Sequence, residues 1–182
     1  MVSWSRIARR IRVPLGFAFT ILFLWLAHPT RASLLTGFGI AAIGLIIRAL
    51  ASGHVRKNEQ LTTSGPYAHL RNPLYFGSLI LAGGFAVAAL SCWIVAVMIL
   101  FFLSIDLPVI RAEEDFLRRQ FPEFDEYARQ VPRLIPRLRP FGNVNGAFSW
   151  DLYWKHREYN AAVGVVVLML ALTAKMVWWH GG

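Results

Sequence analysis

Five long apolar stretches, separated by polar segments of very unequal length, dominate the chain. They cover residues 13–27, 33–51, 74–90, 92–107 and 159–179. A helix needs about 20 residues to cross a bilayer, with a range of about 17 to 25, so the pattern predicts about five transmembrane helices. The third and fourth stretches are almost contiguous, which predicts two short helices joined by a tight turn near Ser91. The expected fold class is therefore all-α and integral to the membrane.

Both ends of this pattern carry signals typical of a membrane protein. The first stretch follows a cluster of arginines, and no clean small-x-small cleavage site comes after it. We therefore expect an uncleaved first helix rather than a secretory signal. In the last stretch Trp178 and Trp179 are placed as interfacial anchors, and the long side chain of Lys175 can reach the interface.

The composition agrees with this class. Of the 182 residues, 56% are hydrophobic and 16% are charged, whereas soluble domains usually carry about a quarter charged residues. The formal net charge is +9, but the cationic residues flank the apolar stretches, as they do in cytoplasmic loops that face anionic lipid headgroups. We expect the lipid bilayer as a partner and no binding of nucleic acid. The single cysteine, Cys92, is expected to be a buried and inert thiol.

The distribution of lysine and arginine predicts the orientation. With the N-terminus inside, seventeen of the nineteen cationic residues lie on the cytoplasmic side, and all ten acidic residues lie there or at that boundary. Five spans then place the C-terminus outside. The predicted location is a bacterial-type inner membrane with any active site facing the cytoplasm.

Two of the cytoplasmic segments, residues 52–73 and 109–158, are too long to be simple connectors. Both are rich in polar, aromatic and proline residues, so chemistry is expected where they meet. We interpret the chain as a single membrane domain, residues 1–182, with a cytoplasmic helical cap. Its expected parts are the first two helices (1–51), a core with helices three and four and the cap (52–140), and a C-terminal extension with helix five (141–182).

The first of these segments contains two breaks. Ser64-Gly65-Pro66 is a turn signal, and Asn72 precedes a proline, which disfavours helical backbone at Asn72. A helix can then begin at or after Pro73, with unpaired backbone N–H groups and a positive dipole end that favour anions. The alternative is an interfacial loop in which Tyr67 and Tyr75 act as aromatic anchors.

The second segment presents two adjacent carboxylates, Glu113 and Glu114. On a helix, Glu113 shares a face with Leu117 and Phe121, whereas Glu114 faces Arg118 at i+4, as in a solvated pair. A carboxylate on an apolar face needs a cationic or hydrogen-bonding partner, and a cofactor ammonium or hydroxyl group would serve. The alternative is that both are ordinary partners of a helix dipole in a first turn.

Other candidate residues carry weaker signals. Asp106 lies at the cytoplasmic end of the fourth span, where it reaches interfacial water. His54 and His69 lack metal-ligand spacing to each other or to Cys92, so no metal site is expected. The chain has no G-x-S-x-G, no G-x-x-x-x-G-K-[ST] and no G-x-G-x-x-G after a strand. No Rossmann domain is therefore expected.

A compound motif runs through both segments. Its parts are Gly65-Pro66-Tyr67, Arg71-Asn72-Pro73-Leu74-Tyr75-Phe76-Gly77, Glu113-Glu114, Leu117, Phe121, Tyr127, Val131-Pro132-Arg133 and Pro136. In order and spacing this resembles the integral-membrane methyltransferases of the isoprenylcysteine carboxyl methyltransferase and phospholipid methyltransferase group, over roughly residues 44–140. The pattern of that family is an RHPxYxG block, a helical hairpin and a paired-glutamate block that ends in a VP…P tail.

The resemblance implies a methyltransferase that uses S-adenosylmethionine, releases S-adenosylhomocysteine and has no Rossmann domain. By position, the cofactor pocket would be lined by Gln60, Leu61, Thr62, Tyr67, Asn72, Pro73, Leu74, Tyr75 and Glu113. Arg71, Arg111 and Glu114 would lie near the substrate as the catalytic group. Glu113 is also the glutamate that the helical-face argument selects.

The chain departs from the family pattern at three places. Asn72 stands where the family usually has histidine, Pro122 stands where glycine is common, and Arg111 precedes its glutamate at a different spacing. Asparagine can donate and accept a hydrogen bond but cannot titrate near neutral pH. A mechanism that needs an imidazole base at this position is therefore disfavoured, and no residue is an evident general base.

The expected function is methyl transfer to a lipophilic or membrane-accessible acceptor. A prenylated cysteine carboxylate, a phospholipid amine and a small thiol are all compatible with the resemblance. The competing class is a non-catalytic membrane scaffold or transport subunit, although a transporter more often has ionisable residues at mid-membrane. A family member that has lost activity is the third alternative, because of Asn72.

Overall fold

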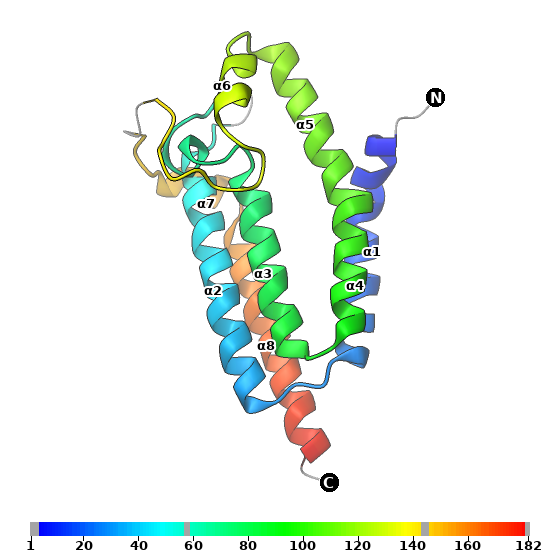
Figure 1. Ribbon diagram of the computed structural model, residues 1–182. Helices are drawn as coiled ribbons and strands as arrows, with labels where there is room; N and C mark the ends of the chain where they lie inside the picture. The colour runs from blue at the N-terminus through cyan, green and yellow to red at the C-terminus, as the bar shows by residue number, and fades with distance from the viewer. Residues whose placement is uncertain (1–3, 57–58, 143–145, 181–182) are drawn as a thin grey trace. The chain divides into compact units, whose positions relative to one another are not determined.

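The computed structural model describes residues 4–56, 59–142 and 146–180, and every regular element within these ranges is helical (Figure 1). The all-α fold predicted from the apolar pattern is confirmed. The elements are α1 (Trp4–Leu26), α2 (Arg31–His54), the 3-10 turn η1 (Gly65–Ala68), α3 (Pro73–Ala89), α4 (Cys92–Phe101), the π-helical turn η2 (Phe102–Asp106), α5 (Leu107–Gln120), α6 (Phe124–Gln130), α7 (Trp150–Lys155) and α8 (Tyr159–His180).

The apolar helices occupy the predicted stretches. Three are long and apolar enough to cross a membrane: Arg31–His54, Cys92–Gln120 and Tyr159–Trp178. The described residues also contain two shorter apolar helices, Pro14–Leu26 and Pro73–Ala89. The predicted membrane class is thus confirmed, and two of the five apolar helices are shorter, at 10–17 residues.

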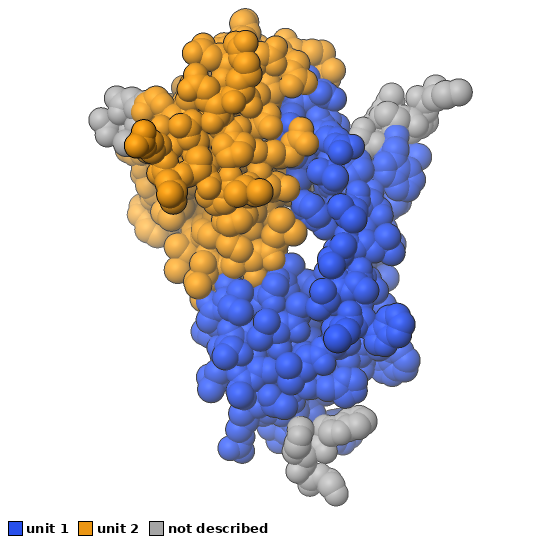
Figure 2. All heavy atoms as spheres, viewed as in Figure 1, with its two compact units in different colours: residues 1–41, 82–115, 166–182 blue, residues 42–81, 116–165 orange. Residues whose placement is uncertain are grey.

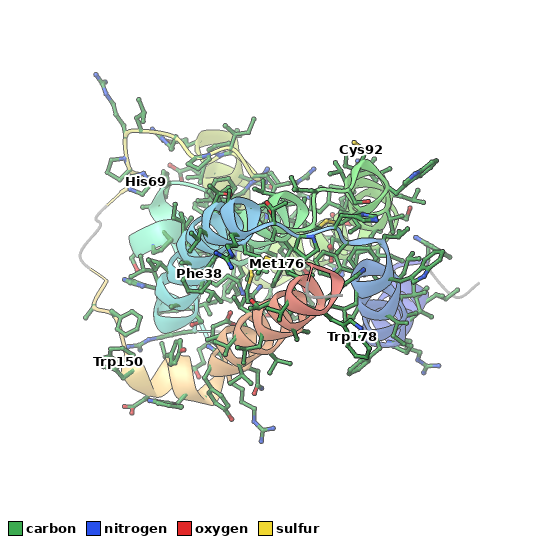
Figure 3. The ribbon with its side chains drawn as sticks, turned by 90° about the horizontal axis from the view of Figure 1, so that it is seen from below. Phe38, His69, Cys92, Trp150, Met176 and Trp178 are labelled. Atoms are coloured by element: carbon green, nitrogen blue, oxygen red, sulfur yellow. The ribbon has the colours of Figure 1, made fainter. Side chains whose placement is uncertain are left out.

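The turn between α3 and α4 lies where the sequence predicts it. α3 ends at Ala89, Leu90 adopts a left-handed conformation with φ of 49°, and Ser91 precedes the first residue of α4. Cys92, labelled in Figure 3, is that first residue and is exposed. The expectation of a buried thiol is therefore wrong, because the residue lies at a helix end next to the turn rather than within a packed span.

The fourth apolar stretch continues further than predicted. α4 passes through η2 into α5, so residues 92–120 form one helix of 29 residues. Because Pro108 has no N–H, the Ser104 carbonyl lacks the hydrogen bond that a residue four positions later would donate in an α-helix. The Trp4 indole N–H donates to this carbonyl instead, at 2.9 Å. Glu113 and Glu114 consequently lie inside a long helix and not in a first turn.

Two compact units make up the chain, and each combines segments that are distant in sequence (Figure 2). Unit 1 comprises residues 1–41, 82–115 and 166–182, and unit 2 comprises residues 42–81 and 116–165. The longer helices α2, α3 and α8 each contribute to both units.

Unit 1 is built on a close approach of α2 and α3, which lie side by side (Figure 1). A Cβ atom added at Gly84 would lie 2.6 Å from the Ala41 nitrogen, and one added at Gly37 would lie 2.5 Å from the Gly84 carbonyl oxygen. Such small-residue contacts are typical of membrane helices, because lipid removes the hydrophobic drive and leaves van der Waals packing to hold helices together.

The end of α1 is held by α8 within the same unit. The ammonium group of Lys175 donates to the carbonyls of Leu24 and Trp25 at 2.6 and 2.9 Å. A lysine commonly satisfies the last carbonyls of a helix in this way. Lys175 therefore caps α1, whereas Trp178, three residues further along α8, is 87% exposed (Figure 3).

Candidate active site

The motif loop, residues 59–72, folds as its glycine and prolines predict. Gly65 has φ of +56°, a left-handed conformation that side chains disfavour, and it is the first residue of η1, with Pro66 directly after it. α3 then begins at Pro73. Both breaks that the sequence predicts are confirmed, and together they turn the chain from α2 into α3 within unit 2.

A proline-rich tail, residues 131–141, runs along the motif loop. Main-chain hydrogen bonds join the two, from Arg71 N–H to the Pro132 carbonyl at 2.9 Å, from Arg137 N–H to the His69 carbonyl at 3.0 Å and from Phe141 N–H to the Ala68 carbonyl at 2.9 Å. The two halves of the sequence motif are thus bonded to one another in the folded chain.

An apolar cluster supports this pairing. Phe124, Tyr127 and Val131 are its buried members, and Leu61, Leu117, Phe121, Ala128 and Phe141 pack against it. The buried hydroxyl of Tyr127 donates to the Tyr67 carbonyl at 2.7 Å. Several residues that carry the family resemblance therefore serve to hold the loop and tail together.

The predicted cofactor residues of unit 2 lie along the motif loop and the first turn of α3. Thr62 and Tyr67 are each 8% exposed, and the Thr62 hydroxyl accepts from the Arg56 N–H at 3.2 Å. Gln60 is exposed and Pro73 is buried, whereas the half-buried members are Leu61, Asn72, Leu74 and Tyr75, together with the predicted catalytic residue Arg71. This part of the predicted set therefore lies within unit 2, on one continuous stretch of the sequence.

Asn72, the residue that replaces the family histidine, has a defined structural contact. Its side-chain amide donates to the Arg133 carbonyl of the tail at 3.3 Å. This bond needs a donor and no titratable group. An asparagine can therefore fill this place in the loop–tail pairing.

The remaining predicted site residues, Arg111, Glu113 and Glu114, lie on the part of α5 that belongs to unit 1. Glu114 is 3% exposed, whereas Glu113 and Arg111 are exposed. The predicted placement of Glu113 on the buried face and of Glu114 on the solvated face is therefore wrong. The buried side of this helix passes through Ile110 and Glu114, which are one turn apart.

Two charged residues of unit 2 were not among the site residues predicted from the sequence. Arg48 on α2 and Glu158, just before α8, form an ion pair with 2.5 Å between Nε and Oε1. A charge within one apolar stretch and an opposite charge at the border of another are the signal that could have suggested this pair. Within the described ranges, no group of three or more His, Cys, Asp and Glu side chains could hold a metal ion.

The sequence profile of the family described as phospholipid methyltransferase matches residues 15–123 of the chain. This match includes the motif loop and the two glutamates, and it stops before the tail. No solved structure matches the chain.

Two curated relatives are similar to the chain over much of its length. The cobalt-zinc-cadmium resistance protein CzcN of Cupriavidus metallidurans is 37% identical over 140 residues, which are 76% of this chain and 62% of the relative. The nickel-cobalt-cadmium resistance protein NccN of Alcaligenes xylosoxydans xylosoxydans is 40% identical over 118 residues, 64% of this chain and 54% of the relative. The chain therefore spans less than two thirds of the length of either relative.

Proposed function

We propose, on the premise that the chain belongs to the phospholipid methyltransferase family, that it transfers a methyl group from S-adenosylmethionine to a lipophilic or membrane-accessible acceptor. The observation that carries this proposal is the bonded assembly of motif loop, tail and first turn of α3 in unit 2. A non-catalytic scaffold would not need this fixed arrangement of the motif residues.

The side chains of unit 2 suit the chemical groups of S-adenosylmethionine. The start of α3 is the positive end of the helix dipole, which favours an anion such as a carboxylate. The aromatic rings of Tyr67 and Tyr75 can stabilise a sulfonium cation. Gln60, Leu61 and Thr62 would supply polar and apolar contacts to the nucleoside. Outside unit 2, the resemblance assigns the ammonium group to the carboxylate of Glu113, which would accept a hydrogen bond from it.

The bound cofactor would supply a methyl group that is already activated. The chain's own task is then to align the acceptor with that methyl group and to exclude water. Arg71 and Arg111 would attract an acceptor that carries a carboxylate or phosphate, with Glu114 as the third substrate-side group. Asn72 would hold the loop against the tail.

We propose further that the N-terminus and the active site face the cytoplasm and that the C-terminus lies outside. Cys92 offers a direct test because it is exposed and, in this orientation, lies at the outer turn between α3 and α4. A maleimide that cannot cross membranes should label Cys92 in intact spheroplasts. A control chain with Cys92→Ala and Ser64→Cys should be labelled only after permeabilisation; the opposite pattern would reverse the orientation.

The two relatives are named as proteins of resistance to cobalt, zinc, cadmium or nickel. We propose that this chain also acts in resistance to such metals. Methyl transfer to a membrane component would then support growth in these metals. Cells that carry the wild-type chain should tolerate more cadmium or cobalt than cells with Glu113→Ala at equal protein level. Equal tolerance of the two strains would contradict a role in metal resistance. It would not bear on methyl transfer, which is tested separately.

Methyl transfer is tested by supplying methyl-labelled S-adenosylmethionine to the purified protein together with candidate acceptors. Membrane lipid extract, a prenylated cysteine analogue and a small thiol represent the three acceptor classes. Label should enter one class with the wild-type protein and fall to background with Glu113→Ala. Transfer to none of them by folded protein would favour the scaffold alternative or a family member that has lost activity.

A further inference from the structure

The part of unit 2 that follows the tail lies outside the family match, which ends at residue 123, yet it is bonded to the end of α2. Ser149 N–H donates to the Gly53 carbonyl at 2.9 Å, and His156 Nδ1 lies 3.1 Å from the Ser52 carbonyl. One turn earlier on α2, Arg48 binds Glu158. The C-terminal extension thus contacts α2 along two successive turns.

Arg48 extends these contacts to the candidate site. While its Nε donates to Glu158, its Nη1 donates to the Ser78 hydroxyl and, at 3.5 Å, to the Leu74 carbonyl. The Ser78 hydroxyl also donates to the Leu74 carbonyl, at 2.9 Å. A guanidinium group can bridge such partners because its donors point in fixed directions, which a lysine ammonium does not reproduce.

The ion pair determines where the Arg48 head group stays. Arg48 lies within one of the helices that can span a membrane, and the side chains of Arg48 and Glu158 are only 22% and 11% exposed. A cation in such surroundings is costly unless it is paired. Without the carboxylate, the arginine would turn toward water or headgroups and would release Ser78 and Leu74.

We propose that Glu158 is a positioning residue that fixes the first turn of α3 through Arg48. That turn carries Leu74 and Tyr75 and directly follows Asn72, so the inference rests on the proposed function of these residues in cofactor binding. The extension beyond the family match would then be part of the working site and not an appendage.

The test compares Glu158→Ala, Glu158→Asp and the control Glu59→Ala in the full-length protein. Glu59 belongs to the same unit and forms an exposed pair with Lys155 at 3.6 Å, with side chains 58% and 66% exposed. Two quantities are measured: calorimetric affinity for S-adenosylhomocysteine, and amide hydrogen exchange of residues 74–78. Loss of positioning should weaken affinity about tenfold and speed the exchange in Glu158→Ala. Both effects should be smaller in Glu158→Asp and absent in Glu59→Ala.

The outcomes separate this inference from the proposed function. Wild-type affinity and wild-type exchange in Glu158→Ala would overturn the positioning role. If the wild-type protein does not bind S-adenosylhomocysteine, the proposed function fails, and faster exchange of residues 74–78 in Glu158→Ala still decides whether the ion pair fixes this turn. Should Glu158→Ala not fold, Arg48→Lys replaces it, because it keeps the charge and loses the bridge; unchanged exchange there would contradict the inference.

Discussion

In unit 1, α2 and α3 meet through Gly37, Ala41 and Gly84, at distances where an added methyl group would collide with backbone atoms. In unit 2, the motif loop and the tail meet through main-chain hydrogen bonds and through the buried Tyr127 hydroxyl. The first contact depends on the absence of side chains, and the second depends on the presence of donors and acceptors.

The difference follows from the surroundings of each contact. Apolar surface gains little by leaving lipid, so membrane helices associate where their shapes allow a close approach. A loop that buries its backbone must satisfy each N–H and C=O group, and an unsatisfied buried group costs about 1–3 kcal/mol. Added volume should therefore damage the contact between α2 and α3, whereas loss of single polar groups should damage the pairing of motif loop and tail.

The largest effect is expected from Gly84→Leu. The new side chain would meet the Ala41 nitrogen and the Gly37 carbonyl oxygen, which are backbone atoms and cannot move aside. We expect a loss of about 3 kcal/mol or of folded protein altogether, measured by thermal unfolding in detergent. Gly83→Leu is the matched control, because nothing lies within 4 Å of a Cβ atom at Gly83; equal damage by both variants would contradict the packing account.

Glu114→Ala and Glu113→Ala should separate stability from cofactor binding. Glu114 is buried, so its removal deprives neighbouring polar groups of a partner and should cost about 2 kcal/mol in unfolding free energy. Exposed Glu113 should leave the melting temperature unchanged and abolish cofactor binding. The prediction is checked by pairing unfolding curves with calorimetry, and wild-type affinity in Glu113→Ala would remove this residue from the proposed pocket.

Tyr127→Phe tests the loop–tail pairing by removing a single oxygen atom. The Tyr67 carbonyl would lose its buried partner, for a cost of about 1 kcal/mol and a small rise in amide exchange across the tail. Tyr153→Phe removes the same atom from a half-buried tyrosine outside the pairing and should have no effect. A stable Tyr127→Phe protein with unchanged exchange would show that the hydroxyl does not hold the loop.

Asn72 should give the smallest effect on stability. Asn72→Ala loses one partly buried hydrogen bond to the tail, which is expected to cost about 0.5 kcal/mol. Asn72→His keeps a donor and restores the residue usual in the family, so its stability should match the wild type. Turnover of labelled cofactor measures the chemical consequence: a large gain in Asn72→His would indicate that the natural site is impaired.

Local chemistry made part of the fold predictable. Gly65, Pro66 and Pro73 restrict their own backbone, so the turn and the start of α3 could be placed from the sequence. The burial of Glu114 could not, because Glu113 and Glu114 are both within one turn of Leu117 and either face could be the buried one. The helix also ends at Gln120, so Phe121 does not extend the face that favoured Glu113.

The hydrogen bonds and the ion pair that assemble the candidate site could not be predicted from the sequence either. Arg71 and Ala68 meet the tail through backbone atoms, which produce no recognisable residue pattern. His69 meets it through its backbone carbonyl and also through Nδ1, which lies 2.9 Å from the Arg137 carbonyl oxygen. The compound motif showed that loop and tail belong together, but it did not show that the tail pairs with the loop directly. Arg48 and Glu158 are separated by more than a hundred residues, and only the folded chain joins them.

The most direct test of the central claim is calorimetric binding of S-adenosylmethionine and S-adenosylhomocysteine to the purified, folded protein in detergent. We predict binding in the micromolar range or tighter for both, reduced to background by Glu113→Ala. Absence of binding to wild-type protein whose thermal unfolding is cooperative would contradict the claim and would leave the family membership as ancestry without the activity.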